Sequence, residues 1–173
     1  MRNDPVVLGL DLSLRCSAAV VIPPYWRTGW KSLTTMTVGK ELKADATESD
    51  RLDRIVFIME RIGEFALKHG VTHAFVEQYA FSQGTSHAHA LGELGGLVKV
   101  RLHLAHIGVA TVVASQARKF LFGKMPAKGA KKVAVAQLKT MGAEFDTEDE
   151  YDAFVVANYG RSELGMTALA LPR

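Results

Sequence analysis

The order of apolar segments along the chain is the feature that most constrains its fold. Three short runs rich in branched side chains come first, and two more follow, each after a segment with helical spacing. Strands joined by short turns lie antiparallel, whereas a strand reached through a helix usually lies parallel to its neighbour. We therefore predict an α/β fold with a mixed five-stranded sheet. It combines an antiparallel meander of three strands with two parallel strands, and helices cover both faces.

Local patterns predict where each element begins and ends. Pro23 and Pro24 end the second strand, and Thr47 and Thr147 precede acidic residues in the pattern of a helix capping box. The expected strands are 6–12, 17–22, 30–39, 72–77 and 109–114, the last of them buried. Helices are expected from 47 to 70, from 84 to about 105, from 115 to a loop at 123–129, from that loop to 141, and from 147 to about 160.

Length and composition limit the class of protein. With 173 residues, 48% of them hydrophobic, we expect one domain over 1–173 with a short tail at 161–173. No apolar run approaches the roughly 18 residues of a membrane span, and no signal-peptide pattern precedes the first strand, so we expect no membrane association and a cytoplasmic location. Cys16 is the single cysteine, which excludes an intramolecular disulfide and multi-cysteine metal sites.

Charge is distributed unevenly along the chain. No acidic residue lies between Glu93 and Glu144, whereas the remainder of the chain is net negative. A basic sector of this kind favours a polyanionic partner, although the solvated faces of two helices would give the same pattern. The basic residues of the sector are Lys99, Arg101, Arg118, Lys119, Lys124, Lys128, Lys131, Lys132 and Lys139.

Four carboxylates stand where chemistry is expected. Asp11 and Glu77 lie at the ends of otherwise apolar strands, and Asp149 and Asp152 share one face at the start of the last helix. Gathered together, they would repel one another unless divalent cations neutralised them, and an all-oxygen ligand set suits Mg²⁺ or Mn²⁺. Two such ions can hydrolyse phosphodiesters. For each residue the alternative is structural: a hydrogen-bonded turn for the strand carboxylates and a solvated helix start for the other two.

These residues resemble a known family. Gly9-Leu10-Asp11 in a first strand, Val76-Glu77-Gln78 at a later strand end and Asp149-Glu150-Tyr151-Asp152-Ala153 in the last helix resemble the motifs of RuvC-type Holliday junction resolvases, within the RNase H-like superfamily. The resemblance covers about residues 6–159. It implies an RNase H-like fold, a crossover junction endodeoxyribonuclease activity, and dimers that cut four-way DNA junctions with two Mg²⁺ ions per site, which Mn²⁺ can replace.

The resemblance also implies residue roles. Asp11, Glu77, Asp149 and Asp152 would be the catalytic metal ligands, and Leu91-Gly92 with Gly95 resembles the family's dimer-interface helix. The family has an aromatic wedge where this chain has Ala80, so Tyr79 or Phe81 would take that role. The expected DNA-contacting residues are Arg118, Lys119, Lys124, Lys128, Lys131, Lys132, Tyr79 and Phe81.

Two departures leave the substrate open. Besides Ala80, the family's Pro-Gly after the first aspartate is replaced by Leu12-Ser13, which indicates a divergent branch, with a phage origin as one alternative. We predict an endonuclease that resolves Holliday junctions and other branched DNA. The alternatives are an RNase H-like nuclease for flaps, forks or RNA/DNA hybrids, and a non-catalytic protein that binds branched DNA.

Overall fold

The computed structural model describes residues 4–27, 29–78, 86–126 and 128–170. In chain order, its elements are β1 (Val7–Asp11), β2 (Ser17–Ile22), the 3₁₀ helix η1 (Trp30–Ser32), β3 (Thr34–Val38), α1 (Glu48–Lys68), β4 (His73–Glu77), α2 (Ser86–Leu104), β5 (Gly108–Val112), α3 (Ala114–Phe122), α4 (Ala130–Thr140) and α5 (Glu148–Glu163). No described helix is long and apolar enough to cross a bilayer.

The sheet has the predicted mixed topology. Its strand order is β3-β2-β1-β4-β5, with β1 antiparallel to β2 and β2 antiparallel to β3. The strands reached through helices are both parallel to their neighbours, β4 to β1 and β5 to β4. The fold class expected from the order of elements is therefore confirmed.

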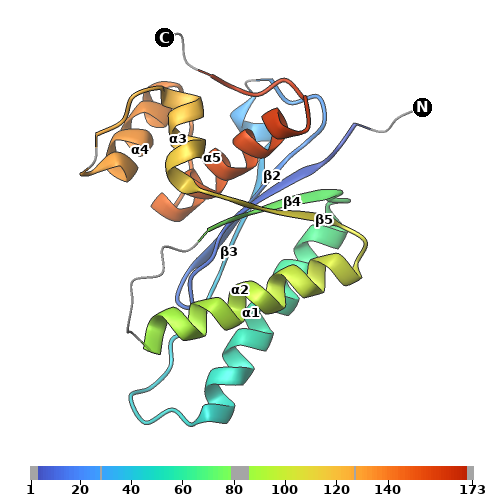
Figure 1. The fold of residues 1–173 in the computed structure, drawn as a ribbon, viewed down its shortest axis with the longest axis vertical. Coiled ribbons are helices and arrows are strands. Elements are labelled where there is room, and N and C mark those ends of the chain that lie inside the picture. The colour runs from blue at the N-terminus through green and yellow to red at the C-terminus, as the bar shows by residue number, and fades with distance from the viewer. Residues whose placement is uncertain (1–3, 28, 79–85, 127, 171–173) are drawn as a thin grey trace.

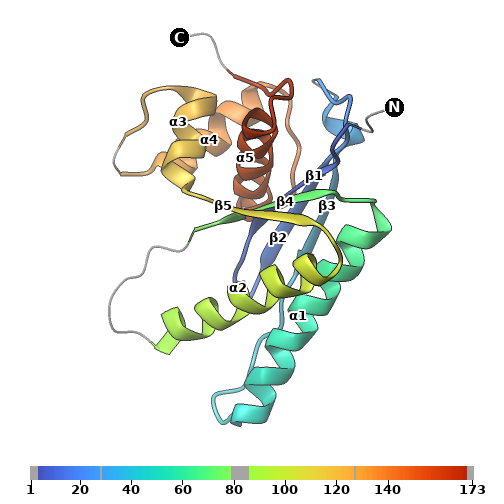
Figure 2. The same ribbon diagram turned by 45° about the vertical axis from the view of Figure 1, so that its right-hand side comes forward.

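Helices cover both faces of the sheet, as predicted. Figures 1 and 2 show α1 and α2 on one face and α3, α4 and α5 on the other. Leu8 and Leu10 of β1 pack into the core under α1 and α2, whereas Val7 packs into the core under α5. Since side chains alternate along a strand, Asp11 falls on the face that α5 covers.

Close packing holds α5 against the centre of the sheet. A Cβ atom on Gly9 would overlap the backbone of Ala153 and of Ala157, so this strand position needs a glycine. At the other end of α5, a Cβ on Gly160 would overlap the ring of Phe75. Because Gly9 and Gly160 have no side chain, α5 lies directly on β1 and β4. This packing brings the start of α5 to the end of β1.

Both predicted capping boxes are present. Thr47 accepts a hydrogen bond from the Asp50 N–H, and the Asp50 carboxylate accepts one from the Thr47 N–H. Thr147 and Glu150 make the same reciprocal pair at the start of α5. Because a capping box satisfies backbone N–H groups that the first turn leaves unpaired, it sets where each helix starts.

Two predicted boundaries were wrong. The strand expected from residue 30 begins at Thr34, because Trp30 turns inward, donates from Nε1 to the Met141 carbonyl at 2.8 Å and packs on Phe154. The last helix does not end at Gly160 but continues to Glu163. Gly160 lies inside the helix, where the absence of a side chain makes room for the ring of Phe75. This glycine therefore serves a packing contact and does not end the helix.

The expectation that residues 109–114 form a buried strand was also wrong. β5 is the edge strand of the sheet, and Gly108, Ala110 and Thr111 are exposed. Only its last residue, Val112, is buried, under α3 and α5. A short run of small and branched residues therefore fits an exposed edge strand as well as a central one.

The segment after residue 160 packs back on the domain. Arg161 is 1% exposed, and its guanidinium donates to the carbonyls of Pro23, Pro24, Trp26 and Thr167. These bonds fasten the chain after α5 to the loop between β2 and β3.

Candidate active site

Three of the predicted carboxylates meet where β1 and β4 end, at the carboxyl-terminal edge of the sheet. Asp11 is the last residue of β1 and Glu77 the last of β4, and these neighbouring strands are parallel, so both carboxylates lie at the same edge. Asp152, in the second turn of α5, completes the group, and one carboxylate oxygen from each of the three lies within 4.8 Å of the others. The alternation of side chains places Asp11 and Glu77 on the α5 face.

Asp149 lies one turn earlier on α5, at the rim of this group. Its side chain is 33% exposed, whereas that of Asp152 is 3% exposed. Lys131 connects the two aspartates: its Nζ lies 2.7 Å from Asp149 Oδ1 and 2.8 Å from Asp152 Oδ2. The same Nζ is 3.7 Å from Asp11 Oδ2. Four carboxylates and one ammonium thus form a connected cluster.

Arg118 is a second cation in the cluster. From α3 it donates through Nε and Nη2 to Asp152 Oδ1, at 3.2 and 2.9 Å. We expected Arg118 and Lys131 to contact DNA, in a stretch of sequence that contains no acidic residue. The fold removes that separation, since it packs α3 and α4 against the acidic start of α5.

Burial and like charge disfavour ionised carboxylates here. Burial and the negative charges of Glu77, Asp152 and Asp149 raise the pKa of Asp11 to about 7, although Lys131 opposes the shift. Burial and Asp152 also raise the pKa of Glu77. Burial lowers the pKa of the Lys131 ammonium, but the hydrogen bonds to Asp149 and Asp152 outweigh it and raise the pKa above its usual value. The cluster therefore holds more negative charge than its two cations balance easily.

The donor set fits a hard divalent cation. Asp11, Glu77 and Asp152 offer only oxygen, which Mg²⁺ and Mn²⁺ prefer, and a cation would relieve the repulsion that raises the pKa of Asp11. Asp149 could join such a site through movement of its partly exposed carboxylate. The acidic cluster can thus hold a metal ion.

Hydrogen bonds order the turn that follows Asp11. Ser17 Oγ donates to the Ser13 carbonyl at 2.6 Å and accepts from the Ser13 N–H at 2.9 Å. Ser13 Oγ in turn accepts from the N–H groups of Arg15 and Cys16. Two serines therefore hold this turn in shape without the Pro-Gly sequence of the resembled family.

The other predicted DNA-contacting lysines lie outside the cluster. Lys119 on α3, Lys132 on α4, and Lys124 and Lys128 on the segment between these helices are exposed. They lie on or between α3 and α4, which Figure 1 shows with α5 on one face of the sheet. Tyr79 and Phe81, the two wedge candidates, lie outside the described residues.

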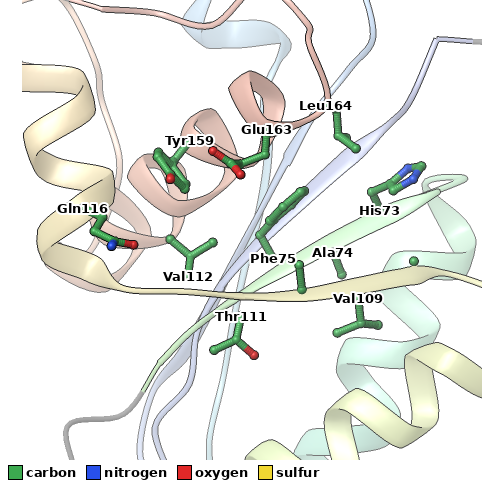
Figure 3. Close-up of a pocket in the computed structure, with 12 residues that line it drawn as sticks. His73, Ala74, Phe75, Val109, Thr111, Val112, Gln116, Tyr159, Glu163 and Leu164 are labelled. Atoms are coloured by element: carbon green, nitrogen blue, oxygen red, sulfur yellow. The ribbon is translucent and has the colours of Figure 1, made fainter.

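A separate cavity of about 460 Å³ lies over β4 and β5, beside the second half of α5 (Figure 3). Phe75, Val112 and Tyr159 border it, with Gln116 and Glu163 as polar groups. None of the four carboxylates is among the described residues that line it. The side chains that line it are mostly apolar, and the cavity is separate from the carboxylate site.

Sequence reasoning missed the direct pairing of Arg118 and Lys131 with the carboxylates. These residues are 34 and 18 positions away from the acids that they contact, Asp152 and Asp149 respectively. No periodicity links positions that far apart. The one sequence feature that hinted at this pairing is charge: a stretch without acidic residues is followed by a helix whose first turn carries three of them.

Comparison with known proteins gives matches in structure alone. No protein-family model matches the chain, and no curated protein matches it. Among solved structures, RuvC from T. thermophilus in complex with a Holliday junction substrate is similar with a TM-score of 0.68 and 18% identity, over 93% of this chain and 96% of that one.

One viral and one mitochondrial protein also have similar structures. The fowlpox virus resolvase, in complex with its substrate Holliday junction DNA, has a TM-score of 0.53 at 12% identity, over 92% of this chain and 98% of that one. The yeast mitochondrial Holliday junction resolvase Ydc2 has a TM-score of 0.53 at 11% identity, over 90% and 79% of the two chains. The chain therefore has the RNase H-like fold of the RuvC-type Holliday junction resolvases, as its motifs indicated.

Proposed function

We propose that this protein is a metal-dependent endonuclease that cuts branched DNA, with Holliday junctions as its main substrate. The observation that carries the proposal is the meeting of Asp11, Glu77 and Asp152 at one edge of the sheet. Sequence motifs alone predict these residues as metal ligands, and the fold brings their oxygens close enough to share a cation. The similar structures, which are resolvases and two of which contain junction DNA, support the substrate class.

The carboxylates would hold two Mg²⁺ ions, with Mn²⁺ as a substitute, through Asp11, Glu77, Asp149 and Asp152. Such ions lower the pKa of an attacking water and stabilise the leaving 3′ oxygen of a phosphodiester. Hydrolysis forms one P–O bond from water and breaks the P–O3′ bond. Glu77 and Asp152 are held in place by β4 and α5, so the ligand oxygens are already positioned before DNA binds.

The basic residues around the cluster would bind the DNA backbone. Lys119, Lys124, Lys128 and Lys132 are exposed on or between the two helices that carry Arg118 and Lys131, and Arg118 and Lys131 contact the carboxylates. Phosphate contacts of this kind position a duplex without reading its sequence. A backbone bound along α3 and α4 would pass over the carboxylates, where a phosphodiester can be cut.

We also propose a homodimer that forms through α2. Leu97, Val100 and Leu104 are exposed on this helix, at 39%, 54% and 71%. A Cβ atom on Gly92 or Gly96 would meet nothing within 4 Å, so this surface leaves room for a second helix to approach. Gly95, which the resemblance places at this interface, is instead buried within the protein. A symmetric pair would present two sites, one for each of two opposed strands of a junction.

The test is an Mg²⁺-dependent cleavage assay on a synthetic four-way junction, compared with a linear duplex, a flap, a fork and an RNA/DNA hybrid. Paired symmetric nicks in the junction, absent from an Asp11→Asn variant that still retards the junction on a gel, are expected. Cutting of flaps, forks or hybrids in preference to the junction would identify the broader nuclease instead. Retardation without cutting would favour a non-catalytic DNA-binding protein.

A further inference from the structure

Both oxygens of Asp152 are occupied by cations of the chain. Oδ1 accepts from Arg118 and Oδ2 lies 2.8 Å from Lys131 Nζ. The Asp152 side chain is 3% exposed, so water contributes little to its solvation. A divalent ion could bind this carboxylate only if it displaced one of the two cations or shared an oxygen with it.

Lys131 is the cation that obstructs metal binding most. Its Nζ is close to Asp11, Asp149 and Asp152 together, and therefore lies where three of the proposed ligands converge. A monovalent and a divalent cation a few ångströms apart repel each other strongly at the reduced dielectric of a partly buried site. Lys131 and a metal ion therefore compete for the same oxygens.

Lys131 is also better placed to leave than Arg118. Its side chain is 35% exposed, compared with 16% for Arg118. It lies in the first turn of α4, directly after Gly129 and Ala130, and this helix start has no side-chain cap. A lysine has four rotatable bonds in its side chain, so its ammonium can swing toward solvent while the helix stays in place.

We propose that Lys131 is an exchangeable counter-ion that couples metal loading to DNA binding. In the free protein its ammonium pairs with Asp149 and Asp152, lies near Asp11, and offsets part of their negative charge. When a divalent cation takes these oxygens, the ammonium is released to contact a backbone phosphate beside the site. This inference rests on the proposed function, because it assigns the released ammonium to a DNA phosphate.

Coupling of this kind is reciprocal. If metal binding releases Lys131 for the phosphate, then phosphate binding withdraws Lys131 from the carboxylates and raises their affinity for metal by the same factor. The free enzyme would then load metal weakly, and the DNA-bound enzyme strongly. Together with Arg118, Lys131 also offsets part of the repulsion among the four acidic groups before any ion is bound.

The first test measures metal binding without DNA. Ca²⁺ is titrated calorimetrically into the wild type, Lys131→Met and Lys132→Met at about pH 8.5, where Asp11 is largely ionised. Lys132 is the matched control, because it is the adjacent lysine and is exposed. We expect Lys131→Met to bind Ca²⁺ about tenfold more tightly than the wild type, the effect of losing a competing charge-assisted hydrogen bond. Lys132→Met should stay within about twofold, since it removes a solvent-exposed charge that water and salt screen.

Equal or weaker Ca²⁺ binding by Lys131→Met would overturn the inference. A Lys131→Gln variant guards against misfolding, since it keeps a hydrogen-bond donor without the charge and should show the same gain. If Ca²⁺ binds to none of these proteins, the counter-ion role is also wrong.

The second test adds a four-way junction, with Ca²⁺ in place of Mg²⁺ so that binding is measured without turnover. In the wild type, the junction should increase Ca²⁺ affinity by a factor clearly larger than in Lys131→Met. An equal factor in both proteins would show that Lys131 does not carry the coupling. Failure of the wild type to bind the junction in this test, or to cut it when Mg²⁺ replaces Ca²⁺, would instead overturn the proposed function. The result without DNA would still decide whether Lys131 competes with metal.

Discussion

The guanidinium of Arg118 and the carboxylate of Asp152 form an ion pair between α3 and α5, with Nη2 2.9 Å from Oδ1. The side chains are 16% and 3% exposed, so the pair is largely removed from water. It anchors α3, which carries Arg118 and Lys119 of the basic sector, directly to the carboxylate cluster. The exposed lysines that follow along α3 and α4 are thereby held beside the site.

Removal of Arg118 should destabilise the fold. Arg118→Ala leaves Asp152 buried with one cation fewer, and we expect a loss of about 2 kcal/mol in the free energy of unfolding, measured by urea denaturation. Arg61→Ala is the control, because Arg61 pairs with Glu64 on the surface of α1, with side chains 54% and 60% exposed. That loss should stay below about 0.5 kcal/mol. Equal losses in the two variants would mean that the buried ion pair stabilises the fold no more than an exposed one.

Stability in the absence of metal should fall as pH rises from about 4 to about 7. The pKa of Asp11 is raised to about 7 in the folded protein, above its value in the unfolded chain. The folded state therefore holds a proton that the unfolded state has released over this range, and its stabilising effect is lost as pH passes the folded pKa. Denaturation in EDTA at several pH values measures the decline.

Asp11→Asn supplies the control for this pH dependence. Asparagine cannot ionise, so most of the decline between pH 4 and 7 should disappear in the variant. Glu77, whose pKa is also raised, would account for what remains. A variant with the full wild-type decline would show that Asp11 does not hold the proton.

Removal of two exposed lysines should weaken junction binding and reduce its salt dependence. For Lys119→Ala combined with Lys132→Ala, the slope of log affinity against log salt should become shallower by about 0.9 for each phosphate that these lysines neutralise in the wild type. Lys68→Ala is the control, since Lys68 is exposed in the last turn of α1, on the opposite face of the sheet. An unchanged slope in the double variant would argue against phosphate binding by these residues.

A charge on the exposed face of α2 should separate the proposed dimer. Val100 is 54% exposed, and Val100→Asp would place a carboxylate in the apolar contact between two copies. Light scattering coupled to size exclusion should report a dimer for the wild type and a monomer for this variant. Leu67→Asp, at a residue of α1 that is 53% exposed, should leave the dimer intact. A monomeric wild type would contradict the α2 interface directly.

Much of the fold was predictable because its signals are local. Strand and helix order, both capping boxes and the break at Pro23 and Pro24 depend on residues a few positions apart. The exposure of β5 was not predictable, because an edge strand and a buried strand of the same composition differ only in what packs beside them. The inward turn of Trp30 similarly depends on Met141 and Phe154, which are distant in the chain.

The candidate site divides in the same way. By itself, the sequence determined which acids could act, because Asp11 and Glu77 end apolar strands and Asp149 and Asp152 are three residues apart on a helix. Only the tertiary structure decided that Arg118 and Lys131 contact those acids. Side-chain direction within a strand or helix follows from a short repeat, whereas contact between two elements depends on how the whole core packs. No local pattern records that packing.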